Sequence, residues 1–152
     1  MRHSVFVSVM ATALFLVAST SRAGDNLKIN PHLDYSSDSQ DGPLITGDRL
    51  DEGIAAHRVN YVIMYGEGCY NSKRQARRTV QLYEKYRGRL NFVIIDLDHP
   101  LSSGQSELVR KHYRGSIPHV LILDKAGKSL YDAPGEFNED EIAALFDKAL
   151  AQ

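Results

Sequence analysis

The alternation of apolar and polar positions predicts a series of strands and helices from about residue 48 to the end of the chain. Short uninterrupted runs of β-branched and aromatic residues are typical of buried strands. Apolar residues that recur at spacings of three and four indicate amphipathic helices. Strands are therefore expected over residues 59–65, 90–97, 119–123 and 129–131, and helices over 48–57, 70–86, 102–113 and 138–150.

The order of these elements indicates the fold class. Strands that alternate with helices of this length form parallel βαβ units, with helices on both faces of the sheet. The last two strands are separated only by the short turn 124–128, so we expect them to form an antiparallel hairpin. The sequence therefore predicts an α/β domain with three layers, α/β/α, around a mixed central sheet of about four strands.

The first 23 residues have the pattern of a secretory signal peptide. Arg2 and His3 precede residues 5–18, which carry no charge, and Ser21 and Ala23 have the small-residue spacing that a signal peptidase accepts. A retained membrane anchor is the alternative, but a spanning helix needs about 20 apolar residues and this run is shorter. We therefore expect cleavage after Ala23, a periplasmic or secreted protein, and no stable insertion into a membrane.

The rest of the chain divides into two parts. Residues 24–47 are polar and turn-rich, with no sustained period, and are expected to form a flexible leader. Residues 48–152 are expected to form a single domain, because a chain of 152 residues is short for two. A net charge of −1, and a basic stretch (73–78) without interleaved stacking aromatics, do not favour nucleic acid as a partner.

Cys69 is the only cysteine of the chain, and it lies between a predicted strand and the predicted helix 70–86. Unpaired N–H groups and the dipole at the start of a helix favour the thiolate over the thiol. Four cations follow within two turns and would act in the same direction, namely Lys73, Arg74, Arg77 and Arg78. For Arg77 and Arg78 the alternative is a place on a solvated face of the helix. Ser72 lies one helical turn after Cys69, so its hydroxyl is placed to donate a hydrogen bond to the sulfur.

Three motifs together resemble the thioredoxin superfamily. They are a Cys-x-x-Ser at the start of a helix (Cys69 and Ser72), the tetrapeptide Ser-Ile-Pro-His before a strand (116–119), and an Asp-Lys-x-Gly turn (124–127). The resemblance covers residues 48–152 and implies a cis Ile117–Pro118 bond that packs against the cysteine. It further implies that the catalytic residues are Cys69, Ser72 and Pro118, and that the substrate-binding residues are Tyr70, Asn71, Ile117 and His119.

The chain departs from this family in ways that restrict its chemistry. The second cysteine of the redox motif is replaced by Ser72, which cannot resolve a mixed disulfide. Ile63 replaces the buried aspartate of thioredoxins, and Gly68 replaces the tryptophan before the first cysteine. Monothiol glutaredoxins share the Cys-x-x-Ser spacing, but their Gly-Phe is Tyr70-Asn71 here and their Gly-Gly stretch is absent. We therefore expect no glutathione-ligated iron–sulfur cluster and no other cofactor.

Two interpretations of His119 remain open. Its imidazole supports the Cys69 thiolate if the two side chains meet, or it is a half-buried side chain that is hydrogen-bonded to the backbone. No metal site is expected, because metal-ligand spacing is lacking among the remaining histidines, His32, His57, His99 and His112.

The motif leaves two main functional hypotheses, and enzyme activity is open between them. In the first, Cys69 carries out monothiol thiol–disulfide exchange with exported protein thiols or disulfides, as isomerase-like shuffling or reversible capping. In the second, the domain is a non-catalytic module that binds extended peptide segments, and Cys69 is not redox-active. A peroxide-reducing cysteine ranks last, because the Pro and Thr that surround such sites in peroxiredoxins are missing.

Overall fold

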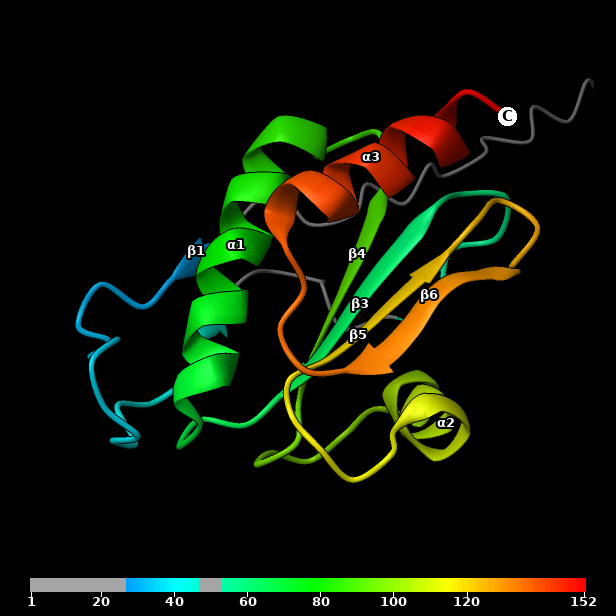
Figure 1. Ribbon diagram of the computed structural model, residues 1–152. Coiled ribbons are helices and arrows are strands. Elements are labelled where there is room, and N and C mark those ends of the chain that lie inside the picture. Colours follow the sequence, from blue (N-terminus) through cyan, green and yellow to red (C-terminus); the bar gives the residue numbers. More distant parts are fainter. Residues whose placement is uncertain (1–26, 47–52) are drawn as a thin grey trace, which may run out of the picture.

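The computed structural model describes residues 27–46 and 53–152, and its centre is a four-stranded sheet in the order β4-β3-β5-β6 (Figure 1). The strands are β3 (Asn60–Tyr65), β4 (Asn91–Asp96), β5 (His119–Leu123) and β6 (Ser129–Pro134). β3 pairs with β4 in parallel, whereas β3 with β5 and β5 with β6 are antiparallel. The predicted mixed sheet with a terminal hairpin is confirmed.

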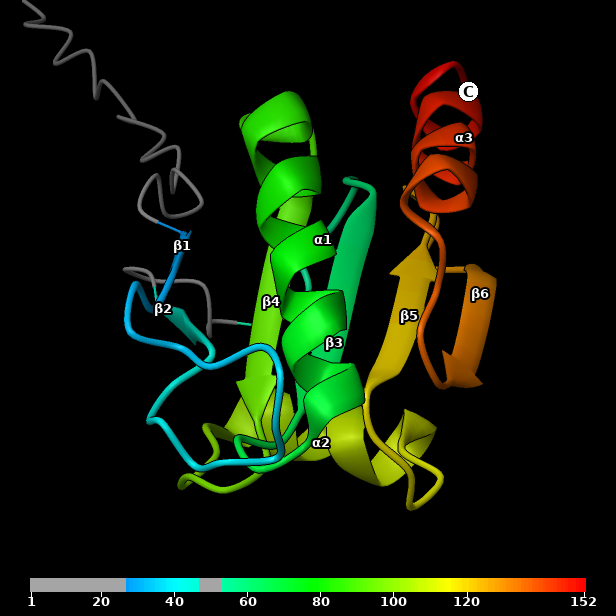
Figure 2. The same ribbon diagram turned by 60° about the vertical axis from the view of Figure 1, so that its left-hand side comes forward.

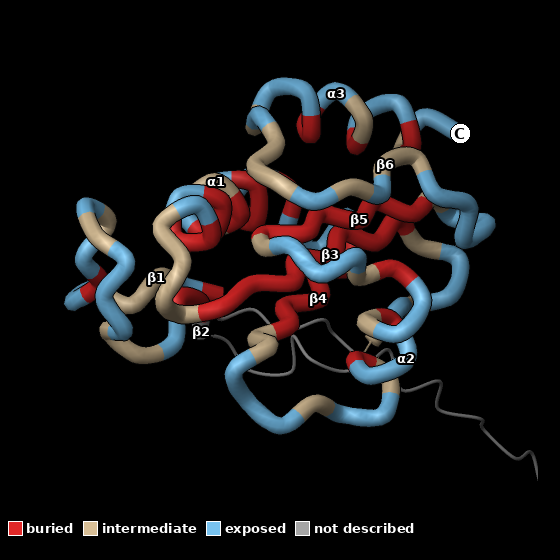
Figure 3. The backbone as a smooth tube through the Cα atoms, turned by 60° about the horizontal axis from the view of Figure 1, so that its bottom comes forward, coloured by how far each residue is buried: buried red, intermediate tan, exposed pale blue. Residues whose placement is uncertain are grey.

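Helices cover both faces of this sheet, as predicted. α1 (Tyr70–Tyr86) and α3 (Glu139–Leu150) lie on one face, and α2 (Ser103–His112) lies on the other. Successive side chains of a strand point to opposite faces, so alternate positions of β3 enter two separate apolar clusters. Figure 3 shows the central strands as a buried layer between the helices.

Most element boundaries lie within two residues of the sequence expectation. Ser102 caps α2 in a reciprocal capping box with Gln105, and the Asn138 side chain accepts N–H bonds at the start of α3. β6 is longer than the three residues predicted, because its pairing with β5 continues as far as Pro134. The predicted helix 48–57 is partly outside the described residues, and 53–57 form no helix.

The signal-peptide prediction, 1–23, also falls outside the described residues. Within the two ranges that the structure does describe, no helix combines the length and the apolarity required to cross a bilayer.

The segment 27–46 differs from the flexible leader that its sequence suggests. β1 (Lys28–Ile29) and β2 (Ile45–Thr46) form a small antiparallel sheet, which lies beside α1 (Figure 2). Four apolar side chains of the segment are buried in the same cluster as α1. They are separated by polar residues without a regular period, so pattern analysis cannot find them. These residues are Leu27, Leu33, Leu44 and Ile45.

A buried lysine joins this segment to α1. The side chain of Lys73 is 0% exposed, and its ammonium donates to the carbonyl oxygens of Asp34 and Ser39, at 2.8 and 2.6 Å, and to Asp41 Oδ2 at 3.1 Å. Hydrogen bonds from Ser36 and Ser37 lower the pKa of Asp34 to about 2. The loop 34–41 thus surrounds the ammonium with oxygen atoms, which a buried charge requires.

The aromatic cluster beneath α3 gives a direct test of the core. Phe146 is fully buried and packs edge-to-face against Tyr61, Tyr86 and Phe92. We expect Phe146→Ala to lower the free energy of unfolding by about 3–5 kcal/mol in urea titrations. Ile54→Ala is the control, because Ile54 is 49% exposed, and its effect should stay within about 0.5 kcal/mol. Equal effects of the two substitutions would contradict this packing.

Replacing the buried ammonium tests the attachment of the N-terminal segment. Lys73→Met keeps the length of the side chain but leaves Asp41 and two carbonyl oxygens without this donor. We expect the free energy of unfolding to fall by about 2–4 kcal/mol. Lys148→Met is the matched control, because Lys148 is exposed on α3. A Lys73→Met protein as stable as this control would show that the segment does not depend on the ammonium.

Candidate functional site

Cys69 lies at the N-cap of α1 and is half-buried. The loop that follows β3 brings its thiol to Ile117, where Sγ donates to the carbonyl oxygen at 3.8 Å. The Ile117–Pro118 bond is cis, with Pro118 buried and Ile117 half-buried. A Cβ atom at Gly66 would lie 2.8 Å from Ile117 Cδ1, so glycine permits this close approach. The structure therefore brings Cys69, Ile117 and Pro118 together.

Ser72, the last residue of the Cys-x-x-Ser motif, does not make the hydrogen bond that the sequence predicts. Ser72 is fully buried, and its Oγ has no hydrogen-bond partner among the described residues. The expected hydrogen bond from Ser72 to the Cys69 sulfur is therefore not formed. Tyr70 is half-buried and Asn71 is exposed at the start of α1, so both are accessible beside the thiol.

The basic side chains that follow Cys69 are engaged elsewhere. Lys73 is directed to the loop 34–41, which corrects the idea that it supports a thiolate. Arg74 pairs with Glu136 and lies over the ring of Tyr70. Arg78 also pairs with Glu136, and Arg77 lies over Tyr35. These contacts draw the cations away from the thiol. The position of Cys69 at the helix terminus is then the remaining feature that favours a thiolate.

Asp38 supplies the cap that Cys69 lacks. The Cys69 side chain makes no capping hydrogen bond, and Asp38 Oδ1 instead accepts the N–H of Tyr70 at 2.7 Å. The neighbouring Gln40 also approaches this loop, since a Cβ atom at Gly68 would lie 3.4 Å from Gln40 Cγ. Asp38 could not be identified from the sequence, because it lies in a segment without periodicity and 32 residues before the amide that it binds.

His119 neither contacts Cys69 nor is hydrogen-bonded to the backbone, so both interpretations from the sequence are wrong. It is fully buried, and Nε2 lies 2.8 Å from Asp132 Oδ1, whose other oxygen lies 2.8 Å from His112 Nδ1. The strand register turns His119 toward α2, so it forms no pair with Cys69, and its partner is a carboxylate rather than the backbone. Burial alone would raise the pKa of Asp132, but the two histidine hydrogen bonds outweigh it and lower that pKa.

One group of side chains in the described ranges has donor atoms close enough to hold a metal ion. Donor atoms of Glu67, Asp96 and His99 all lie within 4.8 Å of one another. Burial and the Asp96 charge raise the pKa of Glu67. Glu67 follows β3, whereas Asp96 and His99 come from the end of the parallel neighbour β4. Their spacing in the sequence therefore gives no metal signal, and the sequence analysis expected no site here.

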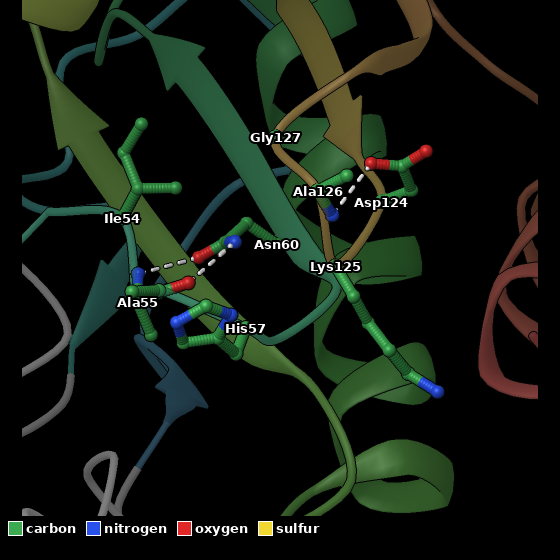
Figure 4. A pocket seen from close by; sticks show the side chains of 9 residues that line it. Ile54, Ala55, His57, Asn60, Asp124, Lys125, Ala126 and Gly127 are labelled. Atoms are coloured by element: carbon green, nitrogen blue, oxygen red, sulfur yellow. Dashed lines mark hydrogen bonds between the residues drawn. The ribbon is translucent and has the colours of Figure 1, made fainter.

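A hollow of about 410 Å³ lies at the opposite end of the sheet (Figure 4). It is formed by residues 54–57, the start of β3 and the turn 124–127, where Asn60 and Asp124 bond to backbone groups of their own loops. These polar groups are satisfied locally, so the hollow offers no chemistry comparable to that around Cys69.

Comparisons with known proteins give a structural likeness only. No family model and no curated protein matches the sequence. A structure described as that of a malarial protein is 22% identical, covers 61% of this chain and 98% of its own, and has a TM-score of 0.51. Thioredoxin-2, described as a component of malaria parasite protein secretion machinery, is 21% identical, covers 64% of this chain and 89% of its own, and has a TM-score of 0.53. Identities this low carry over the architecture and not the activity. The chain has the thioredoxin fold.

Proposed function

We propose that this is an exported protein that forms mixed disulfides with protein partners through Cys69. The observation that supports this function best is the position of the thiol. It is half-buried at the amino end of α1 and lies against the carbonyl oxygen of Ile117. The dipole at this end of a helix stabilises negative charge on sulfur, although Asp38 already binds the first N–H group of α1, that of Tyr70. Export rests on the signal-peptide pattern of residues 1–23.

The proposed reaction replaces one disulfide by another. The Cys69 thiolate attacks one sulfur of a partner's disulfide, a Cys69–partner bond forms, and the partner's second sulfur leaves as a thiolate. A thiol of the partner, or an external thiol, then attacks the mixed disulfide and releases Cys69. No net oxidation occurs in this cycle, and Ser72 cannot contribute the second thiol. The protein would therefore shuffle or cap disulfides rather than reduce them.

The partner segment is proposed to lie along the edge formed by Ile117. Ile117 is half-buried beside the thiol, while Tyr70 and Asn71 border the same site on α1. An extended peptide here could pair with backbone groups of Ile117 and place its cysteine over Cys69. His119 has no role in this proposal, because it is buried on the α2 face and bonded to Asp132.

A non-catalytic peptide-binding module is the second candidate. It is favoured by the engagement of Lys73, Arg74 and Arg78 with other partners, which leaves the thiol without a nearby activating cation. In that case peptides would bind at the same edge without forming a covalent bond. The two candidates differ in whether binding requires the sulfur of Cys69.

Scrambled ribonuclease A, which contains non-native disulfides, distinguishes them. With a catalytic amount of small thiol, the wild-type protein should restore ribonuclease activity about tenfold faster than Cys69→Ser, because exchange needs a thiolate nucleophile. Acid-quenched samples should contain a mixed disulfide that reductant removes. Ser72→Ala is the matched control and should behave as the wild type. Equal rates for wild type and Cys69→Ser would leave only the binding module.

Restoring the missing thiol tests whether the site has redox geometry. Ser72 is buried one turn after Cys69, so Ser72→Cys places a second sulfur behind the first. We expect this variant to reduce insulin disulfides at least about tenfold faster than the wild type, since the mixed disulfide can now be resolved internally. Asn71→Cys, with the new thiol on an exposed neighbouring position, should give no such gain. An inactive Ser72→Cys protein would contradict a redox role.

A further inference from the structure

Asp38 is held directly over the amino end of α1. Its Oδ1 lies 2.7 Å from Tyr70 N, and Tyr70 is covalently next to Cys69. Bond lengths therefore keep this carboxylate within about 10 Å of the sulfur, one Debye length at 0.1 M salt. Asp38 is exposed, so its charge also faces any molecule that approaches the thiol.

Lys73 holds the segment that carries Asp38 in this position. Its buried ammonium binds the Ser39 carbonyl oxygen at 2.6 Å and Ser39 Oγ at 3.2 Å, one residue after Asp38. It also holds Asp34 and Asp41, on either side. The segment that carries Asp38 is thus fixed at both ends. Asp38 is therefore held over the start of α1 by the contacts of the segment that carries it, and is not an unrestrained surface side chain.

Three carboxylates lie on the loops next to Cys69. Asp38 lies on the loop 34–41, Glu67 precedes the cysteine by two residues, and Asp98 Oδ2 accepts the Glu67 N–H at 2.7 Å. His99 Nδ1 lies 3.7 Å from Glu67 Oε1. On α1, Lys73 is enclosed by oxygens, and Arg74 and Arg78 share the single carboxylate of Glu136. Arg77 lies over the ring of Tyr35.

We propose that Asp38 is a specificity-determining residue, which makes Cys69 selective for disulfides flanked by basic side chains. The inference rests on the proposed exchange reaction at Cys69. A fixed carboxylate within a Debye length attracts a cationic partner and repels an anionic one before the sulfurs meet. The substrate class is therefore a cysteine in a lysine- or arginine-rich segment.

Two small disulfides of opposite charge test the selectivity on the intact protein. Cystamine carries two ammonium groups, and 2,2′-dithiodiacetate carries two carboxylates. In each case the Cys69 thiolate attacks one sulfur, half of the probe stays bound in a mixed disulfide, and the other half leaves as a thiolate. Intact-protein mass spectrometry gives both rate constants. Their ratio is independent of the fraction of Cys69 that is ionised, because both probes react with the same thiolate.

We expect the cystamine-to-dithiodiacetate ratio to fall by about two- to fivefold in Asp38→Asn at low salt. The asparagine oxygen can still accept the Tyr70 N–H, so the loop is kept. Glu84→Gln is the matched control and should leave the ratio unchanged, because Glu84 is exposed near the opposite end of α1. The wild-type ratio should also fall as sodium chloride is raised, since salt screens the carboxylate.

The possible outcomes separate this inference from the function on which it rests. If both probes react and Asp38→Asn leaves their ratio unchanged, the selectivity is overturned while disulfide exchange stands. If neither probe reacts with Cys69, the exchange reaction and the selectivity fail together. If Lys73→Met, in its folded form, lowers the ratio as Asp38→Asn does, then Lys73 positions Asp38 as proposed.

Discussion

The ammonium of Lys73 is the interaction on which the arrangement of this site depends. A cationic group removed from water is strongly unfavourable unless oxygen atoms replace its hydration. Here two carbonyl oxygens, one hydroxyl and one carboxylate do so, all from the loop 34–41. Because Lys73 belongs to the first turn of α1, the requirement to satisfy its charge holds that loop against the start of the same helix. The segment before the sheet thereby becomes part of the site.

This arrangement gives the cysteine two opposing influences. The amino end of a helix favours negative charge, whereas the carboxylate of Asp38 occupies the N–H group that directly follows Cys69. Because Cys69 is the only cysteine of the chain, no second sulfur can resolve a mixed disulfide internally. In the proposed function, the fixed charge of Asp38 beside the thiol discriminates between partners of opposite charge.

The elements and the local motifs could be predicted from the sequence, whereas the polar contacts between distant segments could not. β3, α1 and α3 follow from apolar periodicity, which is a local property. The meeting of Cys69 and Ile117 follows from the resemblance of their motifs to the thioredoxin superfamily. Lys73 binds oxygens 32–39 residues earlier, and His119 reaches Asp132 through strand register. Neither contact can be predicted from the spacing of residues in the sequence, because each forms only in the completed fold.

Hydrogen exchange at the Tyr70 amide reports directly on whether the loop 34–41 is held over the start of α1. The first N–H groups of a helix have no intrahelical partner and exchange freely unless something caps them. With Asp38 Oδ1 at 2.7 Å, the Tyr70 amide should exchange at least about tenfold more slowly than in an unfolded chain. Exchange at the unfolded rate, in a protein whose β3 amides remain protected, would contradict the account.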